Sequence, residues 1–280
     1  MNEPTCTPRD AVCDAVYIEA LKRGLSEREA HAAAEDVADR LRLPGQCDAP
    51  PEAGFYDLRD EQDYWYPGGR RKTLIRGNQV VMRAPEEVTT IVVHQTAAEY
   101  GVSRRAVEFA GGDVELARAR RALDVACHAM AFRAGYFVAA HPLRTYVQHA
   151  GRFNGYSLGL EVEGRYPGLL DDPDTLPRED LLTTWGGSPS ELTEETLIAA
   201  QAALTWLVDE GRREGMPIRY VVAHRQSSDN RRSDPGEEIW RRLVLEYAVD
   251  ELGLEAQRES PWREGRPIPT EWDPSGLGPY

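Results

Sequence analysis

The stretch Ile-Arg-Tyr-Val-Val-Ala-His (218–224) and its counterpart Thr-Thr-Ile-Val-Val-His (89–94) decide the fold. Each holds a short apolar run, which is typical of a strand buried on both faces of a sheet, and each ends at a histidine. If the two strands are parallel neighbours, both imidazoles emerge at one rim, where open α/β sheets hold their ligands. Asp234 follows the second histidine after a polar loop of nine residues, which is long enough to curl back.

His94, His224 and Asp234 form a ligand set that is typical of catalytic zinc, because two imidazoles and one carboxylate leave a fourth position open. Each residue also has a simpler interpretation. A histidine at a strand end more often only hydrogen-bonds to a loop. Asp234-Pro235-Gly236-Glu237 is a good helix start, with Asp as N-cap, Pro at N1 and Glu at N3. Taken alone, Asp234 favours the cap, although its two carboxylate oxygens allow both roles.

The surrounding pattern predicts an α/β protein with a mixed central β-sheet flanked by helices. Met130–Phe132 and Tyr136–Ala140 flank a hairpin signal at Arg133-Ala134-Gly135. Leu158–Glu163 alternates, so that Glu161 points away from the apolar face of its strand. Helices are expected at Ser103–Val125 with a break near Gly111-Gly112, from Thr193 to about Arg213, and near 236–252.

Composition shifts divide the chain into four segments. A small N-terminal helical extension is expected at 1–45, where Ser26 begins a capping box. Residues 46–75 are loop-like and interpreted as a linker that packs on the main body. The main domain spans 76–255, and 256–280 is expected to be an extended or partly disordered tail.

The totals exclude some classes of function. The 280 residues carry a formal charge of −14, which argues against nucleic-acid binding, because that requires clustered Lys and Arg. No segment approaches the roughly 18 apolar residues of a membrane span. The N-terminal residues show no basic stretch followed by an apolar run, so we expect synthesis in the cytoplasm without a signal peptide. An external target would then require release or delivery of the protein.

Five motifs along the chain resemble those of the zinc-dependent N-acetylmuramoyl-L-alanine amidase family, which shares its fold with peptidoglycan recognition proteins. Their order and spacing match the family over about residues 76–250. They are Ile-Val-Val-His-Gln-Thr-Ala (91–97), the hairpin His128–Pro142, Gln-His-Ala-Gly (148–151), Ser-Leu-Gly-Leu-Glu-Val-Glu-Gly (157–164), and Val-Val-Ala-His (221–224) with Asp234-Pro235-Gly236.

The resemblance implies roles for the site residues. His94, His224 and Asp234 would bind Zn²⁺, and Glu161 would be the acid/base carboxylate. His149 and His128 are the candidates for substrate binding, His149 lining the groove and His128 as a groove-wall or structural residue.

Two positions depart from the family pattern. Arg232 stands where many members carry a lysine that steadies the developing oxyanion. Arginine keeps the charge, but its planar fork differs in geometry from a lysine ammonium. Cys127 stands where some members carry a tyrosine.

The implied activity is hydrolysis of the amide between N-acetylmuramic acid and L-alanine in peptidoglycan or muropeptides. Such an enzyme would degrade cell walls as a phage lysin (endolysin) or an antibacterial effector, or would recycle muropeptides in the cytoplasm. A non-catalytic peptidoglycan-binding module and a divergent amidase that acts on another amide are the alternatives.

Overall fold

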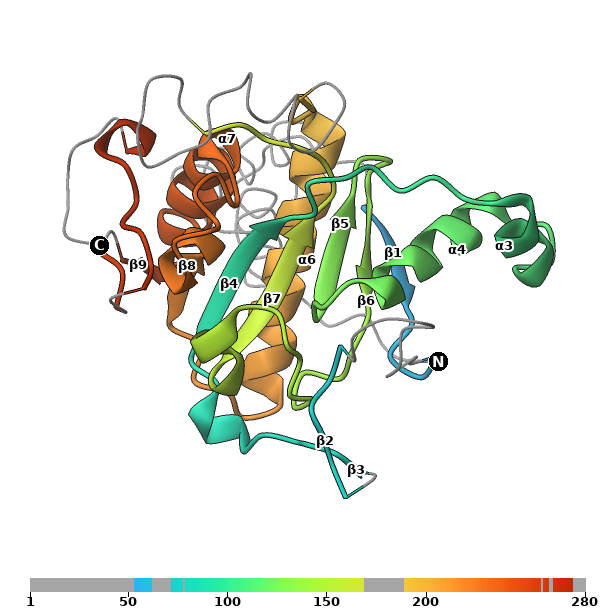
Figure 1. Ribbon diagram of the computed structural model, residues 1–280, viewed down its shortest axis with the longest axis horizontal. Coiled ribbons are helices and arrows are strands. Elements are labelled where there is room, and N and C mark those ends of the chain that lie inside the picture. Colours follow the sequence, from blue (N-terminus) through green and yellow to red (C-terminus); the bar gives the residue numbers. More distant parts are fainter. Residues whose placement is uncertain are drawn as a thin grey trace, which may run out of the picture. The chain divides into compact units, whose positions relative to one another are not determined.

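A seven-stranded mixed sheet is the centre of the fold (Figure 1). The computed structural model describes residues 53–61, 72–77, 79–168, 189–257, 259–261 and 264–273, so the helices expected at 1–45 lie outside the described residues. The strands of the sheet, in spatial order, are β1 (Gly54–Asp57), β6 (Tyr136–Ala139), β5 (Ala129–Phe132), β7 (Ser157–Val162), β4 (Thr90–Gln95), β8 (Tyr220–Ala223) and β9 (Glu255–Ala256).

The pairing of these strands confirms the predicted mixed sheet. β5 and β6 form the predicted antiparallel hairpin, and the other neighbouring pairs are parallel. The predicted parallel neighbourhood of the two histidine strands is therefore confirmed, because β4 pairs directly with β8. A separate antiparallel pair joins β2 (Ile75–Arg76) to β3 (Gln79–Val80).

Two helices cover one face of the sheet. α6 (Glu194–Arg213) begins at the predicted N-cap Thr193, whose side chain accepts a hydrogen bond from Thr196 N. α7 (Glu237–Ile239) continues as a π-helix over Trp240–Val249. Both helices pack on the alternate apolar residues of the central strands, forming the main core with Ile91, Val93, Leu158, Leu160, Val221 and Ala223. Burial of this continuous apolar layer is the main driving force for folding.

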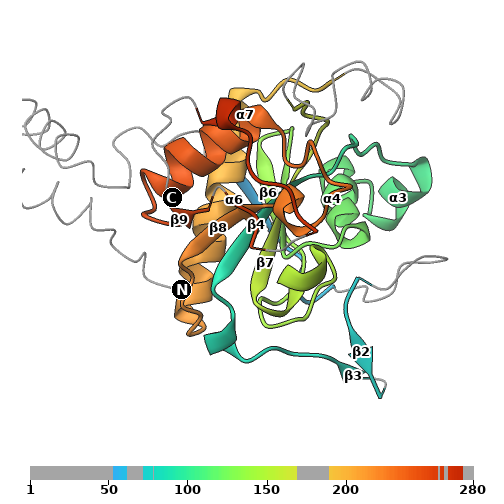
Figure 2. The ribbon, with the colours of Figure 1, turned by 60° about the vertical axis from the view of Figure 1, so that its left-hand side comes forward.

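Two short helices lie on the opposite side of the sheet from α6 and α7 (Figure 2). α3 (Arg104–Phe109) and α4 (Val114–Ala119) are separated by Gly111 and Gly112, which both have positive φ angles. The predicted break near these two glycines is therefore confirmed. A positive φ angle interrupts a right-handed helix, and glycine adopts it at low cost because it has no Cβ atom. Short 3₁₀ helices complete the described structure at Pro85–Glu87, Arg120–Asp124, Gly151–Gly155, His224–Ser227 and Thr270–Trp272.

The structure differs from the sequence analysis at both flanks of the main body. Within the segment interpreted as a linker, Gly54–Asp57 forms the edge strand β1, where Phe55 stacks on Phe137 with ring centroids 4.7 Å apart. Within the expected tail, Trp272 is fully buried in the main core. Both segments are too short for a periodic pattern, so their apolar residues gave no strand or helix signal.

The part of the chain that the structure describes holds no helix of the length and apolar character needed to cross a bilayer.

Candidate active site

The candidate site lies where three neighbouring parallel strands end. Alternation along β4, β7 and β8 places Val92, Gly159 and Val222 on the face opposite to the main core. Two residues further along and on the same face, His94 on β4 is paired directly with Glu161 on β7. His224 directly follows β8 and begins the short 3₁₀ helix His224–Ser227. The geometry that brings these side chains together is the parallel pairing inferred from the two apolar runs.

The three predicted ligands converge with one donor atom each. His94 Nδ1 lies 2.8 Å from His224 Nδ1, and His224 Nδ1 lies 2.8 Å from Asp234 Oδ2. All three donor atoms lie within 4.8 Å of one another, and all three residues are buried. The ligand atoms of a tetrahedral zinc ion, at about 2.0–2.1 Å from the metal, lie roughly 3.3 Å apart. The nitrogen and oxygen donors present here are therefore of the types that Zn²⁺ takes, and they lie close enough together to share one ion.

The carboxylate of Asp234 is held by β4 and does not cap a helix. The Gln95 amide N–H donates to Asp234 Oδ1 (2.9 Å), which leaves Oδ2 facing His224. α7 begins only at Glu237, after Gly236 with a φ of 101°, and without a side-chain cap. The helix-cap role that the residues alone favoured for Asp234 is therefore wrong, because the loop returns this side chain to the sheet.

Burial controls the charge of the donor groups. It lowers the pKa of His224 to about 3 and that of His94 well below its usual range, so both imidazoles are neutral and carry lone pairs at pH 7. Burial raises the pKa of Asp234 to about 6, against the opposing effect of nearby His94. Neutral imidazoles and a carboxylate are the forms that bind a divalent metal.

Glu161 lies beside the three donors without joining them. Its Oε1 is 3.9 Å from His94 Nδ1, and its Oε2 is buried with no hydrogen-bond partner among the described residues. Burial, reinforced by the nearby charge of Asp234, raises the pKa of Glu161 well above its usual range. A carboxyl group that holds its proton more tightly is suited to general acid–base chemistry near neutral pH.

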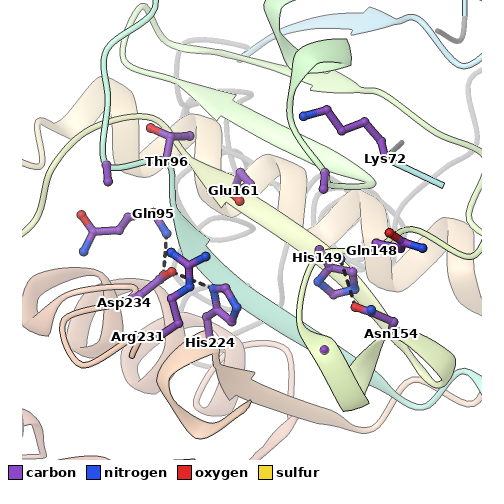
Figure 3. Close-up of a pocket in the computed structure, with 13 residues that line it drawn as sticks. Lys72, Gln95, Thr96, Gln148, His149, Asn154, Glu161, His224, Arg231 and Asp234 are labelled. Carbon is purple, nitrogen blue, oxygen red and sulfur yellow. Dashed lines mark hydrogen bonds and ion pairs between the residues drawn. The ribbon is translucent and has the colours of Figure 1, made fainter. Parts of the chain in front are cut away.

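A pocket of about 580 Å³ opens over these residues (Figure 3). Glu161, His224, Asp234 and His149 line it. The substrate-binding role of His149 stays a prediction. His128 is not among the described lining residues. It is fully buried behind the wall, where its Nδ1 accepts from Gly159 N and its Nε2 lies 3.1 Å from Thr145 O. This position is that of a structural residue.

Of the two neighbouring arginines Arg231 and Arg232, it is Arg231 that lines the pocket. The charge of Arg231 partly opposes the rise that burial causes in the pKa of Glu161 and Asp234. Arg232 is not among the described lining residues. The resemblance to the family implies Arg232 by its spacing from Asp234, but spacing alone does not show which side chain a loop turns toward the pocket. Lys72 is a second lining cation that the sequence analysis missed, since it lies in a segment interpreted as linker.

Residues 84–237, more than half of the chain, match the family model described as N-acetylmuramoyl-L-alanine amidase. The chain belongs to this family.

Solved structures to which the chain is similar include amidases and peptidoglycan recognition proteins. The N-acetylmuramoyl-L-alanine amidase LysC from Clostridium intestinale is 14% identical, with 63% of this chain and 94% of LysC covered and a TM-score of 0.38. The Drosophila peptidoglycan recognition protein SD is 14% identical, with coverages of 77% and 98% and a TM-score of 0.37. The Ph2119 endolysin from a Thermus scotoductus bacteriophage is 16% identical, with coverages of 70% and 98% and a TM-score of 0.35. No curated protein matches the chain.

Proposed function

We propose that this protein is a zinc-dependent amidase that hydrolyses the bond between the lactyl group of N-acetylmuramic acid and L-alanine in peptidoglycan. The observation that carries the proposal is the convergence of His94, His224 and Asp234 beside a pocket that Glu161, His224 and Asp234 line. A recognition module requires a groove that binds its ligand. Binding alone does not require a buried carboxyl group beside a metal-ligand set. Membership of the amidase family supports the same conclusion.

The residues of the site have separate roles in the proposed hydrolysis. A zinc ion held by His94, His224 and Asp234 would supply Lewis-acid chemistry, polarising the amide carbonyl and activating water. Glu161 takes the proton of the attacking water and passes it to the leaving amine, because its carboxyl group lies within the pocket and its pKa is raised. Arg231 places a positive charge where negative charge develops on the carbonyl oxygen.

Zinc content and product analysis test this proposal together. Asp234→Asn keeps Oδ1 as an acceptor for Gln95 N while it replaces the anionic ligand oxygen, so the variant is expected to fold with reduced zinc and activity. The matched control is Asp250→Asn, which changes an exposed aspartate directly after the π-helix Trp240–Val249. It should retain both zinc and activity.

Mass spectrometry of a muropeptide digest identifies the bond that is cut. Cleavage at the proposed bond releases an intact peptide that begins with L-alanine. A zinc-free wild-type protein, or an Asp234→Asn variant as active as the wild type, refutes the proposed chemistry. Muropeptide binding without turnover identifies a recognition module instead, and a different product identifies a divergent amidase.

The proposed reaction degrades cell walls, because it separates the stem peptides from the glycan strands. Loss of turbidity in a suspension of isolated cell walls tests this consequence. Intact turbidity under conditions where soluble muropeptides are cleaved contradicts a lytic role and favours muropeptide processing.

A further inference from the structure

A chain of hydrogen bonds leads away from the metal-ligand set on the side of His94 that does not face the donors. His94 Nε2 lies 3.0 Å from His149 Nδ1, and the other ring nitrogen of His149, Nε2, lies 3.2 Å from Ser157 Oγ. The Ser157 hydroxyl in turn lies 2.7 Å from the carbonyl oxygen of Phe153. All four residues are buried. This series of hydrogen bonds therefore ends at an atom whose role is fixed, because a carbonyl oxygen can accept a hydrogen bond but cannot donate one.

Counting protons from that carbonyl fixes every donor in the chain. Ser157 has a single hydroxyl proton, and only that proton can join Oγ to Phe153 O. Ser157 Oγ therefore accepts from His149 Nε2–H, which leaves His149 Nδ1 as the acceptor of a neutral ring. His149 Nδ1 in turn accepts from His94 Nε2–H. The remaining nitrogen, His94 Nδ1, then carries a lone pair, and it is the atom that faces His224 and Asp234.

The fold holds the His149 ring in place for this contact. Asn154 Oδ1 accepts from the backbone N–H groups of His149 and Ala150, which fixes the backbone at His149. Figure 3 shows the contact between Asn154 and His149. Gly159 lies directly under the ring, and a Cβ atom there would come within 2.8 Å of His149 Nδ1. The glycine of the Ser-Leu-Gly-Leu-Glu strand therefore makes room for the very atom that accepts from His94.

We propose that His149 is a positioning residue, which together with Ser157 holds His94 in the Nε2–H tautomer so that Nδ1 is presented to the metal. The proposal rests on the proposed zinc function and deepens it. It gives His149 a role beyond that of a groove wall. Partners of this kind orient metal-ligating histidines, and their loss typically weakens metal affinity by about 10–100-fold.

Two substitutions of His149 separate hydrogen bonding from packing. His149→Asn keeps an acceptor close to the former Nδ1 position, since the amide oxygen sits at the same distance along the side chain. His149→Leu fills the space with apolar atoms and offers no acceptor. The dissociation constant for zinc is measured for both variants and the wild type, with a competing chromophoric chelator. We expect His149→Leu to weaken zinc binding by about 10–100-fold and His149→Asn to stay within about threefold of the wild type.

Equal zinc affinities of His149→Leu and the wild type overturn the proposal, and so do equal losses in both variants, which indicate packing alone. Failure of the wild type to bind zinc refutes the proposed function instead, so the two failures are distinguishable.

A direct measurement of the tautomers does not depend on any His149 variant folding. Long-range ¹H–¹⁵N spectra of the metal-free wild-type protein report which ring nitrogen carries the proton. We expect Nε2–H for both His94 and His149, and a mixture of tautomers for His149 in Ser157→Ala, where the acceptor is removed. A proton on His149 Nδ1 in the wild type overturns the proposal, because that nitrogen could not then accept from His94.

Discussion

Replacing Glu161 with glutamine isolates proton transfer from every other property of the site. The substitution keeps the shape of the side chain and removes its ability to exchange a proton. Because Glu161 Oε1 lies 3.9 Å from His94 Nδ1 and outside the donor set, zinc content should not change. General acid–base groups contribute about 10²–10⁴-fold. We therefore expect kcat to fall by this factor, which corresponds to about 2.7–5.4 kcal/mol in the activation barrier.

A matched control lies two residues further on, directly after the end of β7. Glu163 is also buried, but its two oxygens accept from backbone groups, Oε1 from Tyr100 N (2.6 Å) and Oε2 from Arg133 N (3.0 Å). Glutamine has only one acceptor oxygen, so Glu163→Gln leaves one N–H group facing an amide NH₂. We expect a loss of about 1–3 kcal/mol in the free energy of unfolding, with activity retained.

Three measurements on both variants complete this test: single-turnover cleavage of a purified muropeptide, metal analysis, and urea denaturation. We expect each variant to lose one property and keep the other: Glu161→Gln loses activity, and Glu163→Gln loses stability. Zinc-loaded Glu161→Gln with a rate within tenfold of the wild type would refute the acid–base role. Parallel losses of activity and stability in both variants would show that the strand acts only as a scaffold.

Three further outcomes follow from the site and its supports. Arg231→Met should lower kcat/KM by about tenfold or more, and Arg232→Met by less than about threefold, because only the former of the two lines the pocket; equal effects contradict this assignment. Removing zinc with a chelator should lower the thermal midpoint by roughly 8–16 °C if free zinc had exceeded its dissociation constant about a thousandfold, and an unchanged midpoint argues against a bound metal. Trp272→Ala should cost about 3–5 kcal/mol in the free energy of unfolding, and a cost near zero in urea denaturation would show that the segment does not support the core.

The sequence predicted the parts of the site that depend on regular strands. Apolar runs that end at His94 and His224 imply buried parallel strands, and parallel strands place their ends at one rim. The alternation of Leu158–Glu163 likewise predicted that Glu161 points away from the main core, where it stands in register with His94. These inferences required only periodicity, because regular pairing converts a position in the sequence into a position in space.

The loop residues were less predictable, because their side-chain directions depend on contacts that distant segments provide. Asp234 carries a good helix-start signal, and only the backbone N–H of Gln95, from another strand, decides where its carboxylate lies. Arg231 and Arg232 are neighbouring residues of the same type, so the sequence does not distinguish them. The conformation of the loop decides which of the two side chains lines the pocket. The pairing of His149 with His94 depends on the space above Gly159, which no local pattern indicates.

The loop that carries Asp234 owes its position to residues outside the stretch that defines the family. Arg225 N donates to Asp234 O, and the Arg225 guanidinium lies over the Trp272 ring, 5.0 Å from its centroid. Arg266 N donates to Arg225 O, which brings the C-terminal segment against the same residue. Trp272 and Arg266 both lie beyond residue 237, where the family match ends. The family stretch thus supplies the three candidate metal ligands, while part of the support for the loop that carries Asp234 comes from the C-terminal segment. We therefore expect loss of that segment to loosen the site without removing a candidate ligand.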